Sequence, residues 1–290
     1  MIDKNIYLSK SNGNKLYVNV LETKKDAPNV IYIMTPIGTV KDFKDYYTPL
    51  AGNGCNVFAL DLSGKGKSEG ELQDFSMDSI VEDVDTLVDY ILEEYSEDIH
   101  VFGATGTGGI LAQAYLTSNS TQANIVKSFT QTGIAIHGDM SIMGSSTVYK
   151  MLHKIVPLIT KVSPKLTIKF KVPKYKGVNA EKEAAWYEQF QKEHPGALDM
   201  DIAFVKTLLH IFYSPKSPII KKVNCPTLVI IPQHDRFFYP SYVKKYYDSL
   251  SSPKKFHSMN DSHLCFVWNS DEICREVGEW VEENSKVSVV

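Results

Sequence analysis

Apolar and polar residues follow two patterns along the chain. Near its start, residues 5–8 and 15–21 alternate between apolar and polar, which predicts a half-buried hairpin of two strands. Further along, continuous apolar runs bounded by turn-forming residues cover residues 30–34, 56–60, 99–104, 126–131 and 227–232. Runs of valine, isoleucine and leucine of this length are typical of a parallel sheet that is covered on both faces.

Helical periods lie between these runs, at residues 77–94, 108–116 and 271–283. The first has an apolar face made of Ile80, Val84, Leu87, Val88 and Ile91. Its other face carries the carboxylates of Glu82, Asp83, Asp85, Asp89 and Glu93, which we expect in solvent. Strands that alternate with helices predict βαβ units with right-handed crossovers, and therefore an α/β fold with a mostly parallel central sheet.

The strand–helix alternation stops between residues 135 and 222, where helical fragments and prolines replace it. Because the strand pattern resumes at residue 227, we predict a helical cap (lid) at 135–222, inserted into a core formed by 1–134 and 223–290. Three apolar segments of this cap, 155–159, 186–187 and 211–213, either line a substrate pocket or pack the cap onto the core.

The first half of the predicted cap is strongly basic. It carries eight lysines from Lys150 to Lys176 and no aspartate or glutamate. One interpretation is a solvated surface. The other is a docking face for an anionic partner, such as a membrane surface, a carrier protein or an acidic ligand.

Composition narrows the class of protein. The 290 residues are 43% hydrophobic and 22% charged with a net charge of −3, which excludes a disordered protein and gives no sign of nucleic-acid binding. Residues 1–10 do not resemble a signal peptide, and no apolar run is long enough for a transmembrane segment. The four cysteines are scattered, which predicts reduced thiols and a cytoplasmic location.

One segment resembles a known family. Residues 61–68 read Asp-Leu-Ser-Gly-Lys-Gly-Lys-Ser, the D-x-x-G-x-G-x-S pattern of the α/β-hydrolase superfamily. Gly64 and Gly66 supply the backbone freedom that this tight loop needs. The chain is most similar to the capped lysophospholipase and monoacylglycerol-lipase-like members. The resemblance spans nearly the whole chain and implies an α/β-hydrolase fold with a helical cap.

The same resemblance implies an acid and a histidine. Asp235 follows the run at 227–232, where the family's acid lies, and a carboxylate just past a strand suits the orientation of an imidazole. His263 stands where the family's catalytic histidine lies, in the family's order of acid before histidine. We interpret His234, beside the acid, as a bystander.

The expected nucleophile is missing. The family has G-x-S-x-G between a strand and a helix, but residues 103–109 read Gly-Ala-Thr-Gly-Thr-Gly-Gly. Gly108 and Gly109 set the register best, because they allow the helix to pack close to the sheet, and Gly106 then stands in place of serine. A shift by one residue makes Thr105 the nucleophile.

The oxyanion side departs as well. Where relatives carry His-Gly after the strand, this chain has Met-Thr-Pro-Ile-Gly at 34–38, and Pro36 has no N–H to donate. By family position, the backbone amides of Ile37 and Thr107 are the expected oxyanion donors, and they need no particular side chain.

Three functional hypotheses remain open. The first is an enzyme that uses His263 and Asp235 as a general-base pair on a lipophilic acyl or carbonyl compound, without a serine. The second is an ordinary ester or thioester hydrolase in which glycine has replaced the serine at position 106. The third is a catalytically silent protein that binds a ligand or partner. We expect no metal and no organic cofactor.

Overall fold

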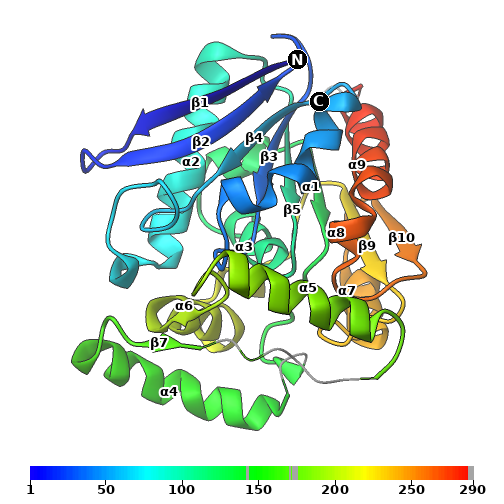
Figure 1. Cartoon of the computed structure of the whole chain (residues 1–290). Coiled ribbons are helices and arrows are strands. Elements are labelled where there is room, and N and C mark those ends of the chain that lie inside the picture. Colours follow the sequence, from blue (N-terminus) through cyan, green and yellow to red (C-terminus); the bar gives the residue numbers. More distant parts are fainter. Residues whose placement is uncertain (142–143, 170, 172–175, 287–290) are drawn as a thin grey trace.

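The computed structural model describes residues 1–141, 144–169, 171 and 176–286 (Figure 1). An eight-stranded sheet lies at its centre, in the order β1-β2-β4-β3-β5-β6-β9-β10. The strands are β1 (Ile2–Ser9), β2 (Lys15–Glu22), β3 (Asn29–Ile33), β4 (Asn56–Leu60), β5 (Ile99–Gly103), β6 (Ser128–Gln131), β9 (Thr227–Pro232) and β10 (Lys254–Met259). Along the sheet, the neighbours in β4-β3-β5-β6-β9-β10 pair in parallel, whereas β2 pairs antiparallel with both β1 and β4.

The apolar runs and the hairpin were predicted correctly, because each run is a buried strand. The sequence pattern missed β10. This strand ends the sheet, and its lysines and histidine leave most of it partly exposed, so it has no continuous apolar run. Charged side chains on such an edge protect it from pairing with other chains.

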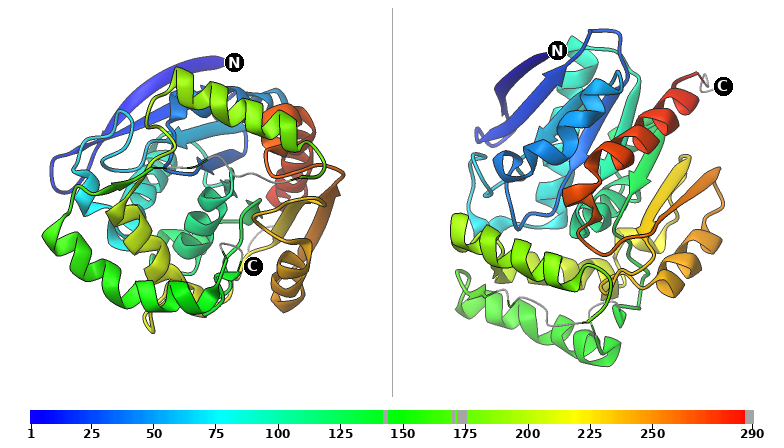
Figure 2. Two further views of the ribbon diagram at one scale, coloured as in Figure 1. Left: turned by 60° about the horizontal axis from the view of Figure 1, so that its bottom comes forward. Right: turned by 45° about the vertical axis from the view of Figure 1, so that its right-hand side comes forward.

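Helices cover both faces of the sheet (Figure 2). They are α1 (Val40–Gly52), α2 (Met77–Glu94), α3 (Thr107–Leu116), α7 (Pro240–Ser249), α8 (Cys265–Trp268) and α9 (Ser270–Ser285). Short 3₁₀ helices cover Leu72–Asp74, Gln122–Ile125 and Pro218–Ile220. α1 and α9 pack together over one face of the sheet, while α2 and α3 bury their apolar side chains against the other. This arrangement is an α/β-hydrolase fold.

One residue of the predicted solvent face of α2 is buried. Asp83 is fully buried, and its Oδ1 lies 2.6 Å from the ammonium nitrogen of Lys10. The backbone N–H of Ser63 donates to its Oδ2 at 2.7 Å. The expectation of an exposed Asp83 is therefore wrong, because β1 and the loop after β4 cover this part of the helix.

The interruption at 135–222 contains α4 (Ser146–Val162), α5 (Ala180–Glu193) and α6 (Ile202–Tyr213). It also contains a short antiparallel pair, β7 (Thr167–Ile168) with β8 (Met200–Asp201), which the pattern did not predict. In Figure 1 these elements lie at one end of the sheet, the end toward which β9 and β10 run. Residues 142–143, 170 and 172–175 of the predicted cap, and 287–290 of the predicted core, lie outside the described residues.

Within the described ranges, no helix is both long and apolar enough to cross a bilayer. The four cysteines are free thiols, and Cys55, Cys265 and Cys274 are buried.

Candidate active site

The turn between β5 and α3 has an unusual backbone. Thr105 has a φ of 55° and Gly106 a φ of 72°, and both values lie in the left-handed region. For a β-branched residue such as threonine this conformation costs about 1–2 kcal/mol. The turn therefore holds a strained backbone at the point where the helix begins, which is where functional residues concentrate strain.

The empty side-chain position of Gly106 faces His263. A Cβ at Gly106 would lie 3.7 Å from Nε2 and 3.6 Å from Cε1 of His263, and 3.5 Å from the ring of Phe238. These are ordinary van der Waals distances, so a small side chain has room here, although the positive φ of Gly106 would strain any residue other than glycine. The imidazole therefore faces a space that is free because residue 106 is glycine.

The glycines that follow allow a very close approach of α3 to the sheet, as predicted. A Cβ at Gly108 would lie 2.5 Å from the carbonyl oxygen of Ile33, and one at Gly109 would lie 2.3 Å from that of Gly133. Gly133, in the loop after β6, is closer still, because its Cβ would lie 1.6 Å from the carbonyl oxygen of Gly106. Side chains at these positions would push the turn away from the sheet.

Asp235 lies in the loop after β9 and contacts His263. Its Oδ2 is 3.0 Å from Nδ1 of His263, and its Oδ1 accepts the backbone N–H groups of Phe237 at 2.6 Å and Phe238 at 2.9 Å. Both oxygens of this buried carboxylate have partners, so its orientation is fixed. His234 points elsewhere, and its Nε2 lies 3.0 Å from Oδ1 of Asn260.

Charge and burial act in opposite directions on His263. Burial by itself lowers its pKa, but the negative charge and hydrogen bond of Asp235, with a smaller contribution from the charge of Glu183, outweigh burial and raise the pKa above its ordinary value. Two aromatic rings flank the imidazole, with centroid distances of 4.3 Å to Phe237 and 6.0 Å to Phe238. The imidazole therefore stands between a carboxylate and two aromatic rings.

Sequence reasoning missed two residues that hold the His263 loop. Glu183 of α5 is fully buried, and its Oε1 accepts the N–H of Leu264 at 2.8 Å. Among the described residues, its Oε2 is buried without a hydrogen-bond partner. Asp261 accepts hydrogen bonds from Trp268 at 2.8 Å and from Asn179, at the start of α5, at 2.6 Å. Hydrogen bonds with Asn179 and Glu183 therefore hold the loop at Asp261 and Leu264, on both sides of His263. No local sequence motif indicates these contacts.

The loop after β3 is tied to the turn by threonines. The N–H of Thr35 donates to Oγ1 of Thr105 at 2.9 Å, and Oγ1 of Thr105 donates to the carbonyl of Ala104 at 2.8 Å. The hydroxyls of Thr35 and Thr107 lie 2.6 Å apart. Thr105 is buried, so its hydroxyl is engaged in holding the loop that carries Ile37.

Thr107 is the first residue of α3, and the first amides of a helix have no acceptor within it. The helix dipole adds positive potential at this end. Ile37 lies in the loop that Thr35 fixes against the turn. The strand–helix junction can therefore offer backbone amides to an anion without help from a serine.

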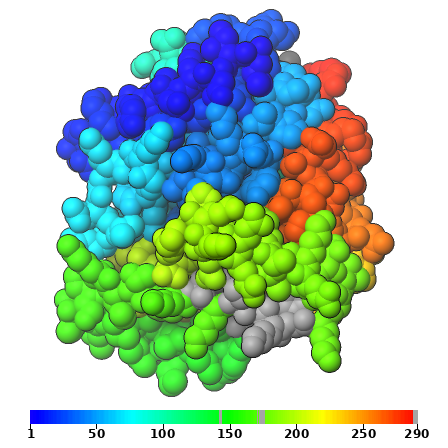
Figure 3. Space-filling model, in the orientation of Figure 1, coloured from blue at the N-terminus to red at the C-terminus, as the bar shows by residue number. Residues whose placement is uncertain are grey.

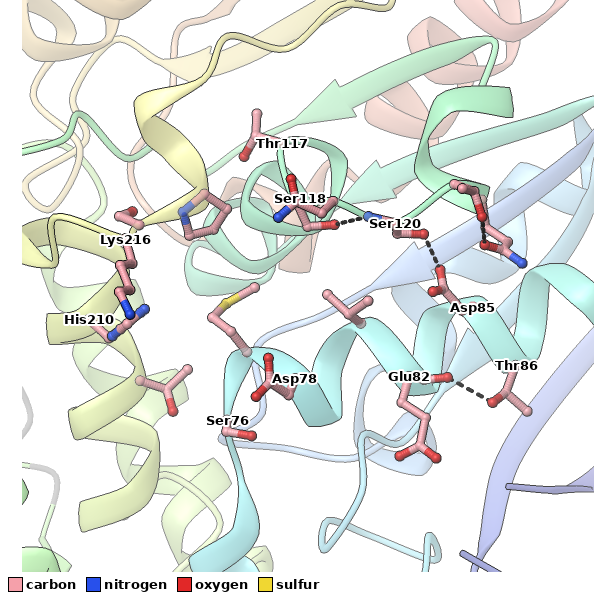
Figure 4. Close-up of a pocket in the computed structure, with 18 of the residues that line it drawn as sticks. Ser76, Asp78, Glu82, Asp85, Thr86, Thr117, Ser118, Ser120, His210 and Lys216 are labelled. Carbon is pink, nitrogen blue, oxygen red and sulfur yellow. Dashed lines mark hydrogen bonds between the residues drawn. The ribbon is translucent and has the colours of Figure 1, made fainter. Parts of the chain in front are cut away.

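Two grooves lie near residues 135–222. One, of about 1570 Å³, runs between α2 and the helices α4 and α6 and is lined by both polar and apolar side chains (Figure 4). Asp85 accepts a hydrogen bond from Ser120 there, while His210 and Lys216 come from the opposite wall. The other, of about 350 Å³, separates Pro36 and Gly38 from Thr167 and from residues 196–201. Neither groove includes Gly106 or His263 in its lining.

In the part of the chain that the structure describes, no three histidine, cysteine, aspartate or glutamate side chains group as metal ligands would. The groups that the structure describes at the site are the imidazole of His263, the carboxylate of Asp235 and the first backbone amides of α3.

A family model matches most of the chain. The model for the Hydrolase_4 family, described as serine aminopeptidase, S33, matches residues 37–262. Because the match spans more than half of the sequence, the chain belongs to this family and is an enzyme of the α/β-hydrolase superfamily. The matched residues include Gly106 and Asp235 and end directly before His263. No curated protein matches significantly.

Solved structures share the fold at low identity. A soluble variant of monoglyceride lipase from Saccharomyces cerevisiae, in complex with a substrate analog, is 15% identical with a TM-score of 0.72, over 99% of this chain and 97% of that one. The α/β hydrolase GrgF from Penicillium sp. is 14% identical with a TM-score of 0.73, over 99% and 100%. The enol-lactonase from Burkholderia xenovorans is 14% identical with a TM-score of 0.65, over 96% and 100%. At these identities the likeness is one of fold.

Proposed function

We propose that this α/β-hydrolase acts on a lipophilic acyl or carbonyl compound by general-base catalysis, with Gly106 in the position of the family's nucleophile. The observation that carries the proposal is the free side-chain position of Gly106. A Cβ placed there would lie 3.7 Å from Nε2 of His263. Water, or a hydroxyl or thiol of the substrate itself, fits this space and takes the place of a serine hydroxyl.

Each group has one task in the proposed reaction. The carboxylate of Asp235 accepts a hydrogen bond from Nδ1 of His263, which leaves the lone pair of Nε2 free to take a proton. The deprotonated nucleophile attacks the carbonyl carbon, and the amides of Ile37 and Thr107 stabilise the resulting oxyanion. The oxyanion then re-forms the carbonyl, the bond to the leaving group breaks, and His263 gives its proton to that group. No acyl-enzyme forms, because the nucleophile is not a side chain of the protein. The rings of Phe237 and Phe238 beside the imidazole favour an apolar substrate.

The test compares three proteins: the unaltered chain, Gly106→Ser and His263→Ala. Each is assayed on nitrophenyl esters of increasing chain length, on thioesters and on aliphatic lactones. We expect the unaltered protein to turn over part of this panel and His263→Ala to lose at least about a hundredfold of that rate. A fluorophosphonate should label Gly106→Ser and leave the unaltered protein unlabelled. Thr105→Val should keep its rate within about tenfold, because the Thr105 hydroxyl is a tether in this scheme.

Other outcomes favour the other hypotheses. If only Gly106→Ser reacts, the site is that of a serine hydrolase in which glycine has replaced the nucleophile. If neither the unaltered protein nor Gly106→Ser reacts, the hypothesis of a catalytically silent binding protein is favoured. Turnover that survives in His263→Ala contradicts the proposal directly.

A further inference from the structure

The outer face of α4 presents apolar side chains to solvent. Val148, Met151, Ile155, Leu158 and Val162 are spaced by three and four residues in turn, so they share one face of the helix. They form the α4 stripe, and all five are exposed, with 59% of Met151, 61% of Leu158 and 84% of Val162 accessible. The apolar segment 155–159 therefore does not line a pocket along its whole length.

The stripe is distinct from the face that packs the cap. Leu152, Val156 and Ile159 lie beside it on α4 and pack against the core cluster, toward α6. In Figure 1, α4 lies beyond α6 from the central sheet, and in Figure 3 it forms the lower end of the visible surface. The cap is therefore held by one half of the apolar arc of α4, while the other half has no covering element among the described residues.

Positive charge accompanies the stripe. Residues 144–169 contain five lysines and no aspartate or glutamate, although the whole chain has a net charge of −3. At 100° per residue, Lys150, Lys154 and Lys161 fall along one edge of the stripe. All three lysines are exposed. Of the eight lysines between Lys150 and Lys176, Lys174 lies outside the described residues.

We propose that the α4 stripe docks the protein onto an anionic lipid surface. An amphipathic helix with aliphatic residues on one face and lysines beside them inserts shallowly at a lipid interface and is attracted by negative headgroups. A second copy of this chain is disfavoured, because it would bring two lysine-rich faces together. Protein interfaces are enriched in tryptophan, tyrosine and arginine and depleted in lysine, whereas the stripe has none of these three enriched residues and lysines lie along its edge. This inference stands independently of the proposed reaction.

The test is flotation of the full chain with vesicles of phosphatidylcholine, with and without phosphatidylserine, at low and high salt. We expect binding to the anionic vesicles that salt weakens. Leu158→Gln should reduce partitioning about tenfold, because it removes apolar surface that the lipid would bury. Lys154→Ala with Lys161→Ala should reduce it about twentyfold on anionic vesicles and little on neutral ones.

Matched controls are Leu92→Gln, an exposed leucine on α2, and Lys41→Ala on α1, which should bind as the unaltered protein does. Because all these side chains are exposed, the variants should keep the unaltered melting temperature. Three results would overturn the proposal: no binding to anionic vesicles, binding that the stripe variants do not change, or a stripe-dependent dimer in place of lipid binding. Tight binding of polyglutamate without vesicle binding would point to an acidic protein and also overturn it.

Discussion

The two halves of the candidate site are held in different ways. On the acid–base side, side chains carry the structure: Asp235 uses both oxygens, one on His263 and one on two backbone amides. On the turn side, backbone carries it: Gly108, Gly109 and Gly133 let the turn approach β3 and β6 too closely for any side chain. The turn geometry therefore does not depend on a hydroxyl at position 106, which is why a glycine there leaves the site assembled.

Asp235→Asn should cause the largest loss of activity on the side of the site that carries Asp235 and His263. The asparagine carbonyl would keep the two backbone amides, so its NH₂ group would face Nδ1 of His263 and force the proton onto Nε2, which could then no longer act as a base. We expect kcat to fall by about 10⁴-fold, measured in the Gly106→Ser background with a nitrophenyl ester. The melting temperature serves as the control for folding, and a loss smaller than tenfold would show that Asp235 does not orient the imidazole.

On the side of the turn, the corresponding substitution is Gly133→Ala, which should lower the stability of the fold. The new Cβ would meet the carbonyl oxygen of Gly106, which is backbone and cannot move aside. We expect the free energy of unfolding to fall by about 3 kcal/mol, measured by chemical denaturation. Gly52→Ala is the matched control, because a Cβ there has no atom within 4 Å. Equal stability of the two variants would rule out the close approach.

A substitution in α5 should have a smaller effect on the side of the site that carries His263 and Asp235. Glu183 helps to raise the pKa of His263, and Glu183→Gln removes its charge while its carbonyl still accepts the Leu264 N–H. A general base must be neutral, so the rate falls as the pH drops through the pKa of His263. In the variant we expect this fall at lower pH, with a change in rate below about tenfold at neutral pH.

Glu181→Gln is the control for this experiment, since Glu181 lies on the same helix but is exposed. A pH profile that stays in place in Glu183→Gln, or moves to higher pH, would contradict the effect of the Glu183 charge on the pKa of His263. Parallel shifts in both variants would mean that only the overall charge matters.

Much of the fold was visible in the pattern of apolar residues. The buried strands and α2 were predicted within a few residues, because a strand covered on both faces requires a continuous apolar run. Exceptions arose where one element's environment is set by another. Asp83 has the pattern of a solvent-facing residue, yet Lys10, far away in the sequence, buries it. The stripe on α4 has the pattern of a core face, yet nothing among the described residues covers it.

The residue types of the site can be read from the sequence: a histidine, an aspartate, Gly106 in place of the expected serine, and glycines that permit a tight turn. Their distances, such as 3.0 Å between Nδ1 of His263 and Oδ2 of Asp235, and the contact made by Glu183 could not be read from it. Local patterns record whether a residue is apolar, whereas hydrogen bonds between distant segments depend on how the sheet and the helices of residues 135–222 bring those segments together.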